Sequence, residues 1–251
     1  MFPCVGLGLA RRRSLMRAVA GVAVGVAVLV AVAGGSLLSR AQDVAVLAPA
    51  PALDDPKAPG AIQTAVLAGG CFWGVQGVFQ HVVGVESAIS GYSGGDMRNP
   101  TYEDVGTGRT GHAESVEIKF DPAQITYGDI LRIYFSVVHD PTQLDRQGPD
   151  FGTQYRSAIF FANDNQERIA RAYVAQLTQA RTFRAPIVTR IDPLKAFYRA
   201  EGYHQDFLIL HPDYPYIVTY DLPKVAEFLR LFPAAWRADP ARATKPRSAP
   251  M

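Results

Sequence analysis

The stretch Gly69-Gly70-Cys71-Phe72-Trp73-Gly74 decides how this sequence of 251 residues is interpreted. The apolar run at 64–68 predicts a short buried strand, and apolar residues recur at helical spacing over 75–82. Cys71 is therefore expected in the first turn of a helix that directly follows a strand. Unpaired N–H groups and the positive end of the helix dipole would stabilise a thiolate there, the reactive form of cysteine. The alternative is a buried structural cysteine with core aromatic residues beside it.

The segments around this stretch alternate between strand-like and helix-like patterns. Strands are predicted at 64–68, 85–92, 112–120 and 157–161, and helices at 71–82 and 126–137. The order β-α-β-β-α-β is that of an α+β fold with a ferredoxin-like core, the split β-α-β arrangement with helices on one face of the sheet. Extra C-terminal helices and coil are expected around 164–180 and 222–232, a further strand at 187–191 and a loop at 97–111.

Glu114 occupies an unusual position in the predicted strand 112–120. Val116, Ile118 and Phe120 alternate onto one face of this strand. By the same count, Glu114 falls on that apolar face, where a lone carboxylate is rare. Burial would raise its pKa, and a neutral carboxylic acid can donate a proton near neutral pH. The alternative is that Glu114 lies beyond the sheet edge, in water.

The first 41 residues have the features of an export segment. Arg11-Arg12-Arg13 precedes an uncharged run at 18–35, and Ser39-Arg40-Ala41 offers the small residues that a signal peptidase reads. The paired arginines also resemble a twin-arginine signal, which predicts an exported, periplasmic protein. The alternative is an uncleaved anchor in the inner membrane, since about 18–20 apolar residues can just span a bilayer.

Composition divides the rest of the chain into three parts. Residues 42–61 are rich in Ala and Pro and predict a linker with little packing. Residues 62–236 are the predicted globular domain, which carries the candidate site. Residues 237–251 contain mainly Ala, Pro, Arg and Lys and predict a disordered tail.

Charge and cysteine content exclude several classes of protein. The net charge of +2 gives no basic face for a nucleic acid, so membrane contact is expected only through the N-terminal segment. Two cysteines, Cys4 and Cys71, cannot form a disulfide framework, and their spacing matches no zinc site. We therefore expect a monomer with no bound metal or cofactor.

The polar residues of the domain suggest chemistry at sulfur. A cysteine hydrolase would need a histidine base, but no histidine lies in a sequence context that selects it. A thiol peroxidase would need neither an aromatic cage nor a buried acid. Aromatic rings suit a methyl group beside sulfur, and a buried acid suits an oxygen that leaves as water. Together these features point to reduction of a sulfoxide. A module that only binds methionine-containing peptides is the non-enzymatic alternative.

At this point a family resemblance becomes specific. Gly70-Cys71-Phe72-Trp73-Gly74 resembles the active-site signature of the A-type peptide methionine sulfoxide reductases. Further motifs of that family follow in order over about residues 62–220: Gly91-Tyr92-Ser93-Gly94-Gly95, Asn99-Pro100-Thr101-Tyr102, Gly111-His112-Ala113-Glu114, His139-Asp140-Pro141-Thr142, Gln147-Gly148-Pro149-Asp150, Gly152-Thr153-Gln154-Tyr155-Arg156-Ser157 and Glu201-Gly202-Tyr203-His204-Gln205-Asp206.

The resemblance implies a mechanism as well as a fold. Cys71 would attack the sulfur of a methionine (S)-sulfoxide, in a protein or as the free amino acid, and become a sulfenic acid. The resemblance implies these roles for the other residues: Glu114 as the acid, Tyr102 and Tyr155 as donors to the departing oxygen, Asp150 as an organising residue, and Phe72 and Trp73 as the methyl-binding rings. Tyr203 and His204, in the last motif, are expected to contact the substrate.

Recycling of the sulfenic acid is expected to need an external thiol. Many family members carry a resolving cysteine in a C-terminal tail or in the loop before the Gly-His-Ala-Glu motif. Residues 237–251 and 105–108 contain none here. The reductant is therefore left open between thioredoxin, glutathione with glutaredoxin, and another thiol-disulfide partner.

Overall fold

The computed structural model describes residues 45–243. The predicted export segment and residues 244–251 lie outside the described residues. The strands are β1 (Gln63–Gly69), β2 (Val85–Ser93), β3 (Ala113–Phe120), β4 (Arg146–Gln147), β5 (Asp150–Phe151), β6 (Ser157–Phe161), β7 (Arg190–Pro193) and β8 (Phe197–Arg199). The α-helices are α1 (Phe72–Gln80), α2 (Tyr102–Gly106), α3 (Tyr127–Ile133), α4 (Asp164–Gln179), α5 (Phe207–Leu210) and α6 (Leu222–Leu231). Shorter helical turns are η1 (Tyr134–Val138), η2 (Thr153–Tyr155), η3 (Gly202–His204), η4 (Ile217–Asp221) and η5 (Pro233–Ala235).

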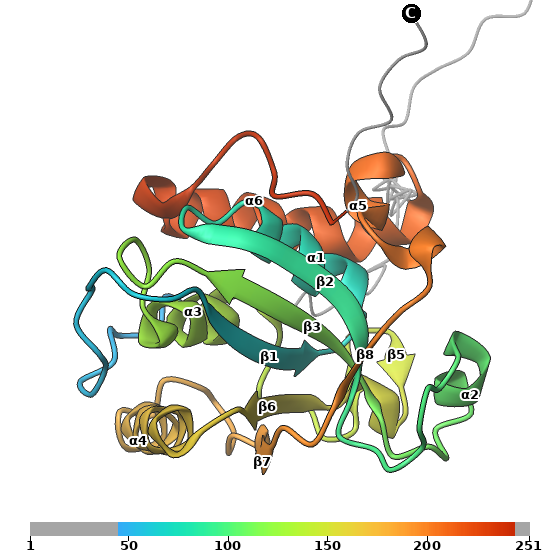
Figure 1. Cartoon of the computed structure of the whole chain (residues 1–251), viewed down its shortest axis with the longest axis horizontal. Helices are drawn as coiled ribbons and strands as arrows, with labels where there is room; N and C mark the ends of the chain where they lie inside the picture. Colours follow the sequence, from blue (N-terminus) through green and yellow to red (C-terminus); the bar gives the residue numbers. More distant parts are fainter. Residues whose placement is uncertain (1–44, 244–251) are drawn as a thin grey trace, which may run out of the picture. The chain divides into compact units, whose positions relative to one another are not determined.

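A six-stranded sheet in the order β7-β6-β1-β3-β2-β8 forms the centre of an α+β fold (Figure 1). β1 is antiparallel to both β3 and β6, and β2 is antiparallel to β3 and β8. Only β7, next to β6, runs parallel to its neighbour. The pair β4-β5 forms a separate two-stranded ribbon. The predicted strands and the long helices are present, with small differences at their ends.

Both faces of β1 are buried, which explains its continuous apolar sequence. On one face Leu67 joins the main core with Phe79 of α1 and Ile118 of β3. On the other face Val66 belongs to a smaller cluster with Phe160 of β6, covered by the segment that leads into β8. A strand buried on both sides is held in one register, because a slip would disturb both clusters. The C-terminal end of β1, where Cys71 follows, is thereby placed firmly.

The predicted loop at 97–111 contains one helix that the sequence analysis did not anticipate. Thr101 accepts a hydrogen bond from the Asp104 backbone N–H, and the Asp104 carboxylate accepts one from the Thr101 N–H, at 3.2 and 3.0 Å. This capping box starts α2, whose five residues are too short to show a helical period. Its effect is to hold Tyr102 at the first position of a helix.

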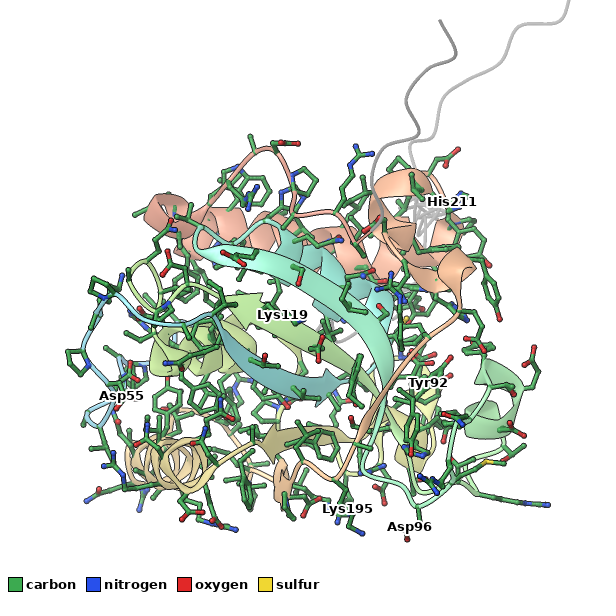
Figure 2. All side chains as sticks on the ribbon, in the orientation of Figure 1. Asp55, Tyr92, Asp96, Lys119, Lys195 and His211 are labelled. Atoms are coloured by element: carbon green, nitrogen blue, oxygen red, sulfur yellow. The ribbon has the colours of Figure 1, made fainter. Side chains whose placement is uncertain are left out.

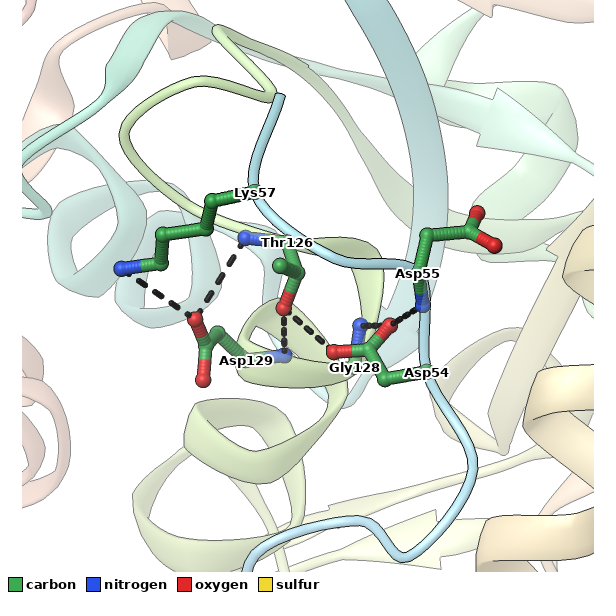
Figure 3. A network of polar contacts seen from close by, with 6 residues as sticks. All are labelled: Asp54, Asp55, Lys57, Thr126, Gly128 and Asp129. Atoms are coloured by element: carbon green, nitrogen blue, oxygen red, sulfur yellow. Dashed lines mark hydrogen bonds and ion pairs between the residues drawn. The ribbon is translucent and has the colours of Figure 1, made fainter.

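Residues 45–61, predicted to be a loosely packed linker, are attached to the domain. Asp54 accepts hydrogen bonds from the Thr126 hydroxyl and from the Gly128 N–H, while Lys57 pairs with Asp129 at 3.7 Å (Figure 3). These contacts satisfy the N-terminus of α3. Ala48 is fully buried. Side-chain and backbone hydrogen bonds, rather than an apolar period, fix this segment, so its composition gave no signal.

The tail predicted to be disordered from residue 237 is also ordered as far as residue 243. The Arg237 N–H donates to the His81 carbonyl and the Ala241 N–H to the Gln80 carbonyl, both at 2.8 Å. The Arg237 guanidinium reaches the Val85 carbonyl at 3.0 Å. These bonds satisfy carbonyl groups at the C-terminal end of α1, which an isolated composition argument cannot detect.

Between residues 45 and 243, no helix has the length and apolar character needed to cross a bilayer. The apolar run at 18–35 lies outside these residues. Within the same residues, no cluster of three or more His, Cys, Asp or Glu side chains is arranged to hold a metal ion.

Candidate active site

Cys71 is the N-cap residue of α1, one position before the predicted first turn. Gly70 makes the turn from β1 possible with a φ of +87°, a conformation that L side chains rarely adopt. A Cβ atom at Gly70 would also lie 2.5 Å from Cβ of Gln147. The turn therefore brings the β4 strand directly against the segment that presents the thiol. Cys71 itself is 9% exposed.

Glu114 is buried beside this turn, as its register in β3 predicts. It pairs with Tyr92 of β2 in the sheet and is 3% exposed. The Phe72 N–H donates to Glu114 Oε2 at 3.0 Å. Burial is the main cause that raises the pKa of Glu114 from 4.5 to about 8, and the carboxylates of Asp150 and Asp221 raise it further. At neutral pH the group is mostly protonated, so its other oxygen can donate a proton to a ligand.

The thiol of Cys71 differs from the stabilised thiolate that its helical position predicts. Burial raises the pKa of Cys71 well above the ordinary value, and the charges of Asp221 and Glu114 raise it further. The Trp73 N–H is a lowering contribution, but it is outweighed. The expectation of a thiolate was wrong for the free protein, because it considered only the helix end and neither the burial of the thiol nor the carboxylates packed around it.

Tyr102, Tyr155 and Asp150 surround the same two groups. Burial, followed by the charge of Glu114, raises the pKa of Tyr102 to about 12 and raises that of Tyr155 as well. Both tyrosines also interact electrostatically with Cys71 and Asp150. They therefore remain neutral hydrogen-bond donors at physiological pH. Five predicted site residues are thus brought together from α1, α2, β3, β5 and η2.

The aromatic residues after Cys71 lie in a larger ring cluster. Phe72 is buried, and its ring centre lies 5.0 Å from His204. Trp73 stacks on Phe207 with ring centres 3.9 Å apart, and its Nε1–H donates to His204 Nδ1 at 3.2 Å. One face of Trp73 is therefore covered, and its position is fixed. Tyr203, also predicted to contact a substrate, is 59% exposed.

Glu201 connects two parts of the site. Its carboxylate accepts a hydrogen bond from the Tyr92 hydroxyl at 2.8 Å and one from the Tyr102 N–H at 2.9 Å. Tyr92 of β2, labelled in Figure 2, is completely buried, and its ring centre lies 5.9 Å from that of Phe72. The bridge holds α2, and with it the Tyr102 ring, against the sheet. Both residues occur in the quoted motifs, so the sequence could have indicated them.

Tyr216 was missed by the sequence analysis. Its hydroxyl donates to Asp150, and its ring stands edge-on to Trp73 with centres 6.1 Å apart. The bond lowers the pKa of Asp150, although burial is the larger effect and leaves the net shift upward. Tyr216 therefore links the Asp150 carboxyl to the aromatic cluster. Nothing in the sequence around it resembles the quoted motifs.

Asp221 was missed as well. It is fully buried, and Lys224 Nζ lies 3.4 Å from its Oδ1. A Cβ atom at Gly74 would lie 2.2 Å from the same oxygen, so Asp221 presses against the first turn of α1. Burial is the main cause that raises its pKa to about 6. The run Asp221-Leu222-Pro223 resembles an ordinary exposed helix start, which hides this role.

Comparisons with known proteins agree with one another. The family model described as peptide methionine sulfoxide reductase matches residues 63–234. Peptide methionine sulfoxide reductase MsrA 2 of Mesorhizobium japonicum is 62% identical over 188 residues, which are 75% of this chain and 96% of that protein. Peptide methionine sulfoxide reductase MsrA of Thermus thermophilus is 45% identical over 175 residues, 70% of this chain and 98% of that protein.

Solved structures with a similar fold belong to the same group of proteins. Methionine sulfoxide reductase A of Corynebacterium diphtheriae matches with a TM-score of 0.53 and 36% identity, covering 68% of this chain and 90% of that chain. Mxr1 from Saccharomyces cerevisiae in its reduced form matches with a TM-score of 0.55 and 30% identity, covering 65% and 92% respectively.

Proposed function

Because the chain belongs to the peptide methionine sulfoxide reductase family, it reduces methionine sulfoxide in protein repair, and we propose that Cys71 Sγ is the nucleophile that attacks the sulfoxide and accepts its oxygen. The observation that carries the assignment is the pairing of this thiol with a buried, protonated acid. The N–H of Phe72 holds one oxygen of Glu114 at 3.0 Å, next to Cys71 in sequence. The second oxygen is free to carry the proton that the sulfoxide needs.

In the proposed step, Cys71 attacks the sulfoxide sulfur while Glu114 protonates the sulfoxide oxygen. The proton of the Cys71 thiol then passes to Glu114 and replaces the one it gave up. Transfer of this oxygen leaves methionine and a Cys71 sulfenic acid, so the substrate sulfur is reduced by two electrons and Cys71 is oxidised by two. Protonation of the sulfoxide oxygen makes the sulfoxide sulfur more electrophilic. Tyr102 and Tyr155 donate to the oxygen as it leaves.

The substrate is proposed to be the (S)-sulfoxide of methionine, in proteins and as the free amino acid. Phe72 and Trp73 would hold its methyl group against their rings. His204 fixes Trp73 through the Nε1–H bond, so it acts as a positioning residue. Tyr203 is exposed at the rim, where it could meet the chain of a protein substrate. Asp150, held by Tyr216, organises the opposite side of the site.

Turnover with dithiothreitol tests the assignment. Wild-type protein should convert a peptide methionine (S)-sulfoxide to methionine and leave the (R)-epimer unchanged. Cys71→Ser should form no methionine, because a serine hydroxyl cannot accept the oxygen under these conditions. Cys4→Ser is the matched control and should retain the wild-type rate. Methionine formation by Cys71→Ser would contradict the assignment.

Regeneration is proposed to use an external thiol and no bound cofactor. Cys71 is the one cysteine among residues 45–243. A first thiol would condense with the sulfenic acid to give a mixed disulfide and water, and a second would release Cys71. Thioredoxin, glutathione with glutaredoxin, or another thiol-disulfide protein could supply these thiols. Comparing multiple-turnover rates with each reductant separates them.

We also propose that the central strands and helices form a ferredoxin-like core. The central strands lie in the order β6-β1-β3-β2, and α1 and α3 follow β1 and β3 in the chain. This supports the ferredoxin-like split β-α-β core. We further propose a monomer, which sedimentation of the purified domain would test. A dimeric sedimentation coefficient would contradict it.

Export remains a proposal about the first 41 residues. The basic run, the apolar run at 18–35 and Ser39-Arg40-Ala41 support cleavage after export to the periplasm. Mass analysis of the mature N-terminus should find a start close to residue 42, and replacing Arg12 and Arg13 by lysine should block export by the twin-arginine route. A membrane-bound chain that still begins at Met1 would favour the anchor.

A further inference from the structure

Cys71 lies on the wall of a cavity that it shares with residues of α6 and of the β4-β5 ribbon. This cavity, here called the recycling cavity, has a volume of about 780 Å³ and is lined by Cys71, Arg146, Tyr216, Lys224 and Arg230 among others. Phe72, Trp73 and Glu114 are not part of its lining. Its size is in the range of sites for small molecules. A small molecule in it would lie against the Cys71 side chain.

The cavity has more positive than negative charge. Lys224, Arg146 and Arg230 line it, and Glu227 is the one carboxylate in the lining. Glu227 is already paired with Arg230 at 2.5 Å. Lys224 is only 14% exposed and is held by Asp221, which stands behind it. An anion in the cavity would therefore meet the Arg146 guanidinium, which forms no ion pair within residues 45–243, and the remaining N–H donors of the Lys224 ammonium, which is paired with Asp221, in a partly desolvated setting where such contacts are strong.

Arg146 has unused capacity for an anion. One guanidinium nitrogen donates to the Gly148 carbonyl at 2.9 Å, and the guanidinium lies 4.4 Å from the centre of the Phe151 ring. Its Nε is buried and has no hydrogen-bond partner in the part of the chain that the structure describes. No carboxylate within that part forms an ion pair with it either. A buried donor without a partner is unfavourable, so a bound acceptor would stabilise it.

We propose that the recycling cavity binds a small thiol that carries a carboxylate and delivers its sulfur to the Cys71 sulfenic acid. This proposal rests on the proposed function, because only that reaction produces the sulfenic acid. The carboxylate pairs with Lys224 and Arg146, and the thiol sulfur attacks Cys71 Sγ. Cys71–SOH and R–SH give Cys71–S–S–R and water. A second thiol of the same class then gives Cys71–SH and the disulfide R–S–S–R.

Asp221 positions Lys224 in this scheme. Its buried carboxyl anchors the ammonium group at the cavity wall, and its own Oδ2 has no partner among residues 45–243. The same carboxyl adjoins the first turn of α1 through Gly74. The anchored lysine therefore has a fixed relation to the helix whose N-cap is Cys71. That relation would align a bound carboxylic thiol toward the sulfenic acid.

The experiment follows the second half-reaction alone. The protein is oxidised with one equivalent of peptide (S)-sulfoxide without reductant, and released methionine is counted. It is then mixed with 3-mercaptopropionate, its methyl ester, or cysteamine, and loss of sulfenic acid is timed by quenching with dimedone. Rates are compared at equal thiolate concentration and corrected for nucleophilicity. Each rate refers only to the protein that carries sulfenic acid.

The carboxylate thiol should react at least about tenfold faster than its ester, as expected for one charge-assisted hydrogen bond, and cysteamine should be slowest. About 0.5 M salt should reduce this preference. Lys224→Met and Arg146→Met should each bring the ratio to within about threefold of unity. Arg146→Met keeps the Lys224–Asp221 pair, so the test stands if Lys224→Met fails to fold. Lys195→Met, which removes an exposed lysine paired with Asp96 at 3.0 Å (Figure 2), should keep the wild-type preference.

The experiment distinguishes failure of the proposed function from failure of the proposed role of the recycling cavity. If no methionine is released before thiol is added, the proposed function is wrong. If methionine is released but acid and ester react equally with wild-type protein, the recycling cavity does not select a carboxylic thiol. A preference that persists in both variants also overturns the proposal. The proposal is also overturned if the first half-reaction is faster with acidic than with neutral sulfoxide peptides and the second shows no preference, because the cavity would then bind the protein substrate.

Discussion

Replacing Glu114 by glutamine separates two consequences of burying this side chain, one for catalysis and one for stability. Glutamine has nearly the same shape as a protonated glutamate and can still accept the hydrogen bond from the Phe72 N–H. It has no proton to give. General acid catalysis is typically worth about 10²–10⁴-fold, so methionine formation in a single turnover should slow by that factor.

The stability change has the opposite sign. Burial raises the pKa of Glu114 from 4.5 to about 8, so the folded protein keeps a proton that the unfolded chain loses between these pH values. The free energy of unfolding therefore falls as pH rises through this window and levels off above it. Over the roughly 2.5 pH units between pH 4.5 and 7, at about 1.36 kcal/mol per unit, the loss is on the order of 3 kcal/mol. Glu114→Gln removes this loss.

The assay compares urea unfolding of both proteins at pH 4.5 and pH 7. Relative to wild type, Glu114→Gln should gain about 3 kcal/mol more at pH 7 than at pH 4.5. Above pH 8 the ratio of the wild-type to the variant single-turnover rate should fall about tenfold per pH unit as the acid loses its proton, because the pH dependence of the Cys71 thiol is common to both proteins. Glu117→Gln, on the opposite face of β3, should change neither quantity. A variant within threefold of wild-type activity, or a stability difference independent of pH, would refute the role of Glu114 as a buried acid.

Two further substitutions test the residues around Cys71. Gly74→Ala would put a Cβ 2.2 Å from Asp221 Oδ1, so the free energy of unfolding measured in urea should fall by about 1–3 kcal/mol. A Cβ at Gly106 would meet no atom within 4 Å, so Gly106→Ala should change this free energy by less than about 0.5 kcal/mol. Equal effects of the two substitutions would contradict the packing of Asp221 against α1. Tyr216→Phe removes the hydrogen-bond donor to Asp150, so the pKa of Asp150 should rise further. The acid side of the pH–rate profile of the first half-reaction should then shift to higher pH, while Tyr214→Phe should leave the profile unchanged. An unchanged profile in Tyr216→Phe would show that the protonation of Asp150 does not affect catalysis.

Periodicity predicted the parts of the site that belong to the sheet. The alternation in β3 placed Glu114 on the buried face, and the apolar run before Cys71 predicted the strand that presents it. The capping box at Thr101 could be detected only as a local motif, because the five residues of α2 are too few to show a repeating apolar pattern. Residues 45–61 and 237–243 are ordered through hydrogen bonds to distant backbone and side-chain groups. Such contacts leave no period in the sequence.

The electrostatic character of Cys71 could not be predicted from its neighbours in the chain. A helix N-terminus alone favours a thiolate. Asp221 comes from 150 positions further along the chain, yet it is the largest charge effect on the thiol. Asp150 and Glu114 act in the same direction from two other strands. Only tertiary packing buries this thiol and brings these carboxyls to one helix end, so the protonation state of Cys71 could not be predicted from the sequence.

A single turnover without any reductant tests directly whether Cys71 takes the oxygen from the substrate. The purified protein is mixed with one equivalent of a peptide methionine (S)-sulfoxide, and both products are measured by mass analysis. About one methionine should be released per protein, and a matching amount of Cys71 sulfenic acid should form, which dimedone traps as a thioether adduct on Cys71. Methionine released without any modification of Cys71, or oxygen found on another residue, would contradict the claim that Cys71 takes the oxygen from the substrate.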